Sequence, residues 1–144
     1  MDRSTTIRGA VLTALSGFKH KNTLVPIFDE IVNPNTTIPK IDGAEVYMVI
    51  QNQQQYDGQH TFCNPRFNLN ITLRIVTKWG LVGSKKLCED IGDAVLALLR
   101  DDRGGSKLAG YQKVEMPVSR TMTEITNQNL AFTKIITLNF IQNG

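Results

Sequence analysis

The chain has 144 residues, of which 41% are hydrophobic and 20% charged, with a formal net charge of +3. Residues 1–144 are expected to form a single domain, because a chain of this length can bury a stable core without disulfides or a metal. No apolar run approaches the roughly 18 residues of a membrane span, and the N-terminus lacks a signal-peptide pattern. These features predict a cytoplasmic protein with no membrane association. Its basic residues are scattered, so charge alone gives no reason to expect nucleic-acid binding.

The first predicted element is a helix over about residues 5–18. Ser4 or Thr5 is available as its N-cap, and Gly17 lies near its end. Apolar residues recur in it at the spacing of one helical face: Ile7, Ala10, Val11, Ala14, Leu15 and Phe18.

Two strands are predicted next, at residues 24–32 and 45–53. Pro26 near the start of the first indicates an edge strand, because proline cannot donate to a ladder. Residues 33–37 break this strand, and Val46 to Ile50 then form a short, largely buried one. The polar stretch 51–58 is expected to be a loop or hairpin tip.

The strongest pattern lies in residues 66–100, where a long alternating strand leads through a loop into an amphipathic helix. The apolar positions of the strand are Phe67, Leu69, Ile71, Leu73, Ile75 and Trp79. The helix, Lys85 to Leu99, carries a stripe of Leu87, Cys88, Ile91, Ala94, Val95, Leu98 and Leu99. Leu69, Ile71, Leu73 and Ile75 are therefore predicted to pack on Ile91, Val95 and Leu98 as one core.

Residues 101–105 predict a turn, and the two alternating runs after it predict a long antiparallel hairpin. The first run has Val114, Met116, Val118 and Met122 at alternating positions, and the second has Leu130, Phe132, Ile136, Leu138 and Phe140. The predicted order is α-β-β-β-α-β-β. Such an order is typical of an α+β domain with a mainly antiparallel, twisted sheet and two helices packed on one face.

Local motifs give no support for catalysis. Gly80 to Lys85 lies between a strand and a helix, but its glycine spacing does not fit a phosphate-binding P-loop, so we expect a turn with Ser84 as N-cap. His60 and Cys63 are spaced like metal ligands, yet no second close pair accompanies them. Cys63 and Cys88 fit reduced thiols, and no Gly-x-Ser-x-Gly elbow is present. We predict that the protein is not an enzyme and holds neither a cofactor nor a metal.

The order of elements resembles that of bacteriophage tail-terminator proteins, also called tail-completion or minor tail protein U-like. The resemblance covers about residues 5–142. It is carried by the first helix, Val25 to Glu30, a loop with Pro34 and Pro39, Val46 to Val49, Phe67 to Trp79, Lys85 to Leu99, and Ala131 to Ile141. The glutamine-rich residues 51–55 do not map onto the family, so a neck ring of a short-tailed phage is a second reading.

The resemblance implies a structural virion protein that closes into a ring at the head-proximal end of the tail or in the neck. Expected partners are copies of itself in a six-fold or twelve-fold ring, a portal, connector or adaptor ring, tail proteins, and genomic DNA passing through the lumen without sequence-specific binding. The virion, and the host cytoplasm during assembly, are the expected locations.

Polar loops are expected at residues 51–65 and 101–112, and they could form a head-to-tail contact between copies. The alternative is a small monomeric module that binds nucleic acid or an acidic partner through an exposed sheet face. Arg66, Arg74 and Lys78 share that face by parity, whereas Phe67 and Trp79 fall on the other, where they cannot stack with bases. The candidate contact residues are Gln53, Gln54, Gln55, Tyr56, Asp57, Arg66, Arg74 and Lys78.

Overall fold

The computed structural model describes residues 3–29, 37–57, 66–80, 82–101, 103–108, 110–111, 113–125 and 129–143. Its elements are α1 (Arg3–Leu15), β1 (Lys19–His20), β2 (Thr23–Leu24), β3 (Ile27–Asp29), β4 (Lys40–Ile41), β5 (Ala44–Asp57), β6 (Arg66–Trp79), α2 (Lys86–Leu99), β7 (Lys113–Ile125) and β8 (Leu130–Asn143).

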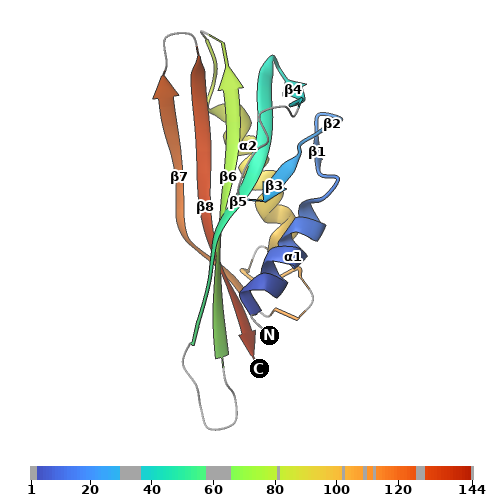
Figure 1. Ribbon diagram of the computed structural model, residues 1–144, viewed down its shortest axis with the longest axis vertical. Helices are drawn as coiled ribbons and strands as arrows, with labels where there is room; N and C mark the ends of the chain where they lie inside the picture. The colour runs from blue at the N-terminus through green and yellow to red at the C-terminus, as the bar shows by residue number, and fades with distance from the viewer. Residues whose placement is uncertain are drawn as a thin grey trace.

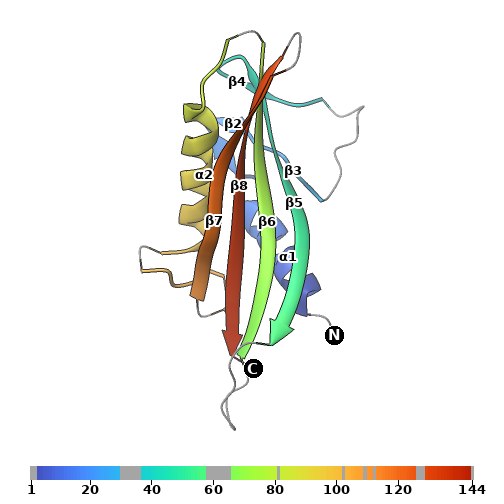
Figure 2. The same ribbon diagram turned by 90° about the vertical axis from the view of Figure 1, so that its left-hand side faces the viewer.

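The long strands form one twisted sheet of order β3-β5-β6-β8-β7, with β4 paired to β5 (Figure 1). Among the described strands of this sheet, β3 alone pairs in parallel, and the other pairs are antiparallel. Both helices lie on the same side of the sheet, as the two views agree (Figures 1 and 2). The predicted α+β class, the mainly antiparallel sheet and the order of the long elements are confirmed.

Helix α1 begins and ends earlier than predicted. Ser4 and Thr5 belong to the helix instead of capping it, so that prediction is wrong; the N–H groups of the first helical turn have no intrahelical acceptors, and the turn tolerates such residues. The chain leaves the helix before Phe18 because Gly17 takes a left-handed conformation with φ of 79°. The predicted apolar stripe is confirmed by the complete burial of Ile7, Val11 and Leu15.

The apolar segment after α1 contributes a short edge strand. Strand β3 pairs in parallel with residues 48–50 of β5, and the Met48 N–H donates to the Pro26 carbonyl at 2.8 Å. This confirms the predicted edge position; residues 30–36, within and after the predicted strand, lie outside the described residues. The two-residue strands β1, β2 and β4 were not predicted, since two residues are too few to show a period.

Strand β5 is longer than predicted, and the prediction of a loop at residues 51–58 is wrong for residues 51–57. They continue β5 and pair with β6 as far as Asp57, past an irregularity between Gln51 and Gln53. A ladder is made by the backbone, so polar side chains do not end a strand whose partner continues beside it. The extra residue also breaks the period of two that sequence reasoning relies on.

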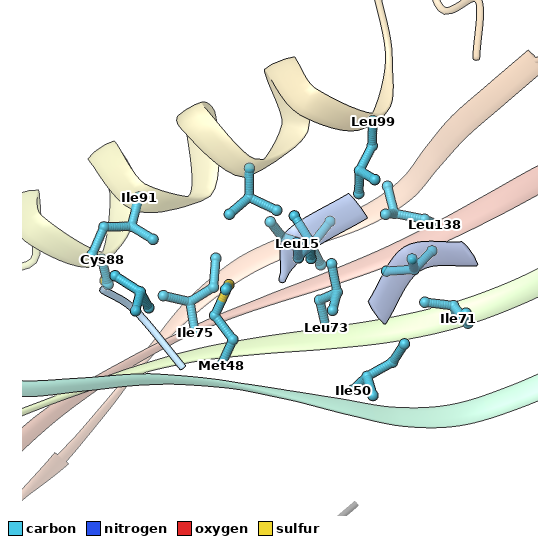
Figure 3. Close-up of a cluster of buried hydrophobic side chains, with 14 of the residues drawn as sticks. Leu15, Met48, Ile50, Ile71, Leu73, Ile75, Cys88, Ile91, Leu99 and Leu138 are labelled. Atoms are coloured by element: carbon cyan, nitrogen blue, oxygen red, sulfur yellow. The ribbon is translucent and has the colours of Figure 1, made fainter. Parts of the chain in front are cut away.

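The core lies between the sheet and the helices (Figure 3). As predicted, Leu69, Ile71, Leu73 and Ile75 of β6 are completely buried there. Figure 3 shows how side chains from every layer converge: Leu15 of α1, Met48 and Ile50 of β5, Ile71, Leu73 and Ile75 of β6, Leu138 of β8, and Cys88, Ile91 and Leu99 of α2.

Helix α2 confirms its predicted span and most of its predicted core face, with Leu98 as the exception. Leu98 is 43% exposed, so its assignment to the core with Ile91 and Val95 is wrong. The buried stripe also includes Gly92, where a Cβ would lie 3.4 Å from Lys134 and 3.6 Å from Ile136 of β8. Because the helix approaches β8 most closely at Gly92, the side of the helix that carries Gly92 and Leu99 faces the sheet. Leu98 lies about 100° around the helix from Leu99 and is therefore turned away from the core.

The start of α2 is also close to its prediction. Lys85 occupies the N-cap position and makes no side-chain cap, so the prediction of Ser84 as N-cap is wrong by one residue. The Ser84 hydroxyl still accepts a hydrogen bond from the Lys86 N–H at 3.1 Å. Ahead of it, Trp79 packs partly buried against the core, and a Cβ on Gly83 would lie 2.3 Å from the Trp79 ring.

The predicted hairpin of β7 and β8 is confirmed, with one correction. The register shifts between Glu115 and Val118, around Pro117. Proline has no N–H for the ladder, and a bulge moves all later side chains to the opposite face. Val114 is therefore in the core, whereas Met122 faces away from the helices and is 46% exposed.

Candidate functional site

The face of the sheet that the helices do not cover is the surface on which the predicted basic residues meet. We call it the open face. Residues directly opposite one another on paired strands share a face, so the registers of β5, β6, β8 and β7 arrange it in rows. In that strand order the rows are Glu45–Lys78–Ala131–Glu124, Tyr47–Val76–Thr133–Met122, Val49–Arg74–Ile135–Arg120 and Gln51–Thr72–Thr137.

Arg74 and Lys78 confirm the prediction that they share the exposed sheet face. Arg74 lies in the centre of that face and lines two adjoining hollows, of about 310 and 620 Å³. The first is also lined by Tyr47, Val76 and Lys78. Arg66 begins β6, but its side chain lies outside what the structure describes.

The open face is an apolar floor beneath polar side chains. Val49 and Val76 are only 6% and 7% exposed without a helix over them, because neighbouring strands and longer side chains surround them. Lys78 Nζ lies 5.6 Å from the centroid of the Tyr47 ring, and that ring meets Phe28 edge-on at 6.0 Å. Tyr47 is thus already engaged by two neighbours.

Arg120 is a residue of this face that sequence reasoning missed. It lies two strands from Arg74 in the same row and lines the larger hollow with Arg74 and Met122. Uninterrupted alternation from Val114 would have placed Arg120 on the helix side. Pro117 inside the strand was the available signal, since proline within a sheet marks edges and bulges.

The other predicted contact residues belong to strand β5. Gln53, Gln54, Gln55, Tyr56 and Asp57 pair with β6 as part of β5, and their side chains lie outside the described part of the chain. Residues 58–65, with His60 and Cys63, are likewise outside it, so neither the metal nor the disulfide expectation for those positions is tested.

The environments of Cys88 and Asp101, two potentially reactive side chains in the described ranges, fit structural roles. The Cys88 thiol is buried, and burial, helped by Glu89, raises its pKa, which disfavours the nucleophilic thiolate. The Asp101 carboxylate accepts hydrogen bonds from the backbone N–H groups of Arg103 and Gly105, and these bonds lower its pKa. The same bonds hold the predicted turn together. Among the described residues, no group of three His, Cys, Asp or Glu side chains is placed to hold a metal.

Comparison with models of known protein families and with curated protein sequences finds no match to this chain. No helix in the described ranges is long and apolar enough to cross a membrane. Its function must therefore be argued from the fold and from the open face.

Proposed function

We propose that this protein is a structural virion component that closes into a ring at the head-proximal end of a phage tail or in the neck. The ring would terminate the tail and join it to the head connector, with DNA passing through its lumen. The protein would enter the virion after folding in the host cytoplasm.

The observation that carries this proposal is a well-packed sheet with one face left uncovered. The covered face packs on both helices, while the open face combines exposed Met122 with Arg74 and Arg120 around two hollows. Exposed apolar residues among charged ones are typical of protein–protein contacts. The order of long elements on which the tail-terminator resemblance rests also recurs in this fold.

A ring needs two different surfaces on each copy. A head-to-tail contact that closes by rotation joins one face of a protomer to another face of its neighbour. The open face and the outer surface of α2 lie on opposite sides of the molecule (Figure 2). Six-fold and twelve-fold closure are the expected symmetries, and a net charge of +3 suits a lumen through which DNA slides.

The competing proposal is a monomeric module that binds nucleic acid or an acidic partner on the open face. Arg74, Lys78 and Arg120 on that face favour it. Glu45 and Glu124 flank Lys78 in its row, however, and a dense basic track is what phosphate backbones require. Tyr47, the aromatic residue of the mapped rows, is occupied by Phe28 and Lys78, so it is a poor platform for base stacking.

Native mass and particle content separate the two functions. Native mass spectrometry of the purified protein should show closed multiples of the 16.1 kDa chain, and labelled protein should be found in mature particles. Contacts between copies can be weak until a neighbouring ring templates them, so the particle is decisive. Absence from purified virions, together with salt-sensitive binding of a DNA oligonucleotide by the monomer, would favour the binding module.

A further inference from the structure

The row that contains Arg74 and Arg120 has an excess of positive charge with no acid in it. Its members are Val49, Arg74, Ile135 and Arg120, and the two arginines stand on strands separated by β8, about 10 Å apart at ordinary strand spacing. Arginine presents several N–H donors in a fixed fork that fits carboxylates. This row therefore offers a place for acidic side chains.

Arg74 has an unmet need for an acceptor. Its Nε atom is shielded from solvent and has no hydrogen-bond partner within the described part of the chain. A shielded donor without an acceptor is costly, and a carboxylate in either hollow would remove that cost once the Arg74 side chain turns to present Nε. Beside it, Met122 is 46% exposed and Ile135 is partly buried. We call Arg74, Arg120, Met122 and Ile135 the basic patch.

Helix α2 carries aspartates beside an exposed leucine on the far side of the molecule. The acidic stripe consists of Asp90, Asp93, Ala94, Ala97, Leu98 and Asp101. The first five are spaced as i, i+3, i+4, i+7 and i+8, so they share one flank of the helix, and Asp101 follows at its exit. Asp93 and Asp101 line one shallow hollow together with Arg100, and Lys107 Nζ donates to the Ala97 carbonyl at 2.6 Å. Basic side chains therefore border the stripe, and its apolar member Leu98 is 43% exposed.

We propose that the basic patch of one copy binds the acidic stripe of the next copy in the ring. This inference rests on the proposed ring and names its contact. Each surface pairs charge with an exposed apolar side chain: Asp93 and Leu98 on the stripe, Arg74 and Met122 on the patch. Because the two surfaces are on opposite sides of the protein, their contact is head-to-tail. Each bound pair of copies keeps one unoccupied patch and one unoccupied stripe, so further copies can add until the ring closes.

Nucleic acid is a poorer occupant of the patch than protein. A phosphate backbone would meet Glu124 two residues along β7 from Met122, and would leave the exposed methionine against a charged strand. A helix flank with aspartates and Leu98 supplies a partner for both the charged and the apolar members. Asp90 pairs with Lys86 at 3.5 Å, and the Asp101 carboxylate accepts hydrogen bonds from the Arg103 and Gly105 N–H groups. Asp93 is therefore the central carboxylate of the proposed contact.

Charge reversal tests the contact. The patch variant combines Arg74→Glu with Arg120→Glu, and the stripe variant combines Asp90→Arg with Asp93→Arg. The control is Lys19→Glu, at an exposed position of β1 that is remote in sequence from both surfaces. Native mass spectrometry over a range of protein concentrations should show association weakened about tenfold or more in each double variant and unchanged in the control. Circular dichroism checks that all three variants are folded.

Mixing the two double variants should restore association. The intact patch of one then meets the intact stripe of the other, and the two reversed surfaces also complement each other. High salt should weaken the wild-type complex and the mixture alike. Failure of the mixture to associate would overturn the proposed pairing.

Other outcomes separate this contact from the ring itself. If both double variants form rings as well as the wild-type protein does, the contact is overturned and the ring proposal still stands. A wild-type protein that stays monomeric at every concentration would overturn the contact as an autonomous interaction, while detection of the protein in virions would still decide the ring proposal. Association of the patch variant with a DNA oligonucleotide as strong as that of wild type would count against the nucleic-acid alternative.

Discussion

The two faces of β6 are made by alternate residues of one strand, yet their surroundings differ. Toward the helices, Ile71, Leu73 and Ile75 are completely buried. On the other face, Thr72, Arg74 and Lys78 range from partly buried to exposed. The contrast teaches that one covered face can supply the stability of an antiparallel sheet and leave the second face free for binding.

The largest expected effect compares neighbouring residues on the two faces. Leu73→Ala should lower the free energy of unfolding by about 2–5 kcal/mol, through lost apolar burial and a cavity in the core. Thr72→Ala, on the open face, should change it by less than about 1 kcal/mol. Urea denaturation of both variants measures the difference, and similar midpoints would contradict the assignment of the faces.

The next effect concerns the loop that leads from β6 into α2. Gly83→Ala should cost about 1–3 kcal/mol, because the new Cβ would lie 2.3 Å from the Trp79 ring and displace it. Gly80→Ala is the matched control, since nothing lies within 4 Å of its added Cβ. Thermal unfolding of the two variants, with Trp79 fluorescence as the probe, should separate them; equal melting temperatures would refute the close packing of Trp79 on Gly83.

A smaller effect compares two ion pairs. Arg8 of α1 is buried and donates to the Asp29 carboxylate and, at 3.0 Å, to the Ile50 carbonyl, whereas Lys21 and Asp42 pair in the open at 2.6 Å. Asp29→Asn should therefore destabilise the protein by about 1–2 kcal/mol, and Asp42→Asn by less than about 1 kcal/mol. Chemical denaturation at low and high salt checks this order, and an equal loss in the two variants would be inconsistent with it.

The smallest effect is a pH dependence of the covered layer. Burial, and secondarily Glu89, raises the pKa of the Cys88 thiol in the folded protein above its unfolded value. The resulting stabilisation is complete below the unfolded pKa and is lost as pH rises through the folded pKa. Wild type should thus lose stability in alkaline solution more steeply than Cys88→Ala, although the variant is less stable at neutral pH. Parallel pH profiles of the two unfolding midpoints would contradict this.

Periodicity predicts the long elements well because the residues that face the core repeat without interruption. The predicted bounds of strand β6 and helix α2 agree nearly to the residue with the structure, and the hairpin of β7 and β8 is predicted as well. Where the period is broken, prediction fails. The irregularity after Gln51 hides the second half of β5, and the bulge around Pro117 hides the turning of Met122 and Arg120 toward the open face.

The candidate surface could be predicted only in part for the same reason. Parity along an unbroken strand is enough to place Arg74 and Lys78 together, but their cross-strand neighbours depend on registers that the sequence does not reveal. The prediction for Leu98 fails for a different reason. Its spacing fits the apolar stripe, and only the close packing of Gly92 on β8 turns the helix so that Leu98 is exposed.

The most direct test of the central claim is to measure which exposed apolar side chains become protected when copies associate. Hydroxyl-radical footprinting over a range of protein concentrations can follow Met122 and Leu98, with Leu24 and Val82 as exposed reference residues outside both surfaces. We predict that oxidation of Met122 and Leu98 falls together as the assembly forms, while Leu24 and Val82 stay unchanged. Assembly that leaves Met122 as reactive as in the monomer would contradict the assignment of the open face as the contact surface.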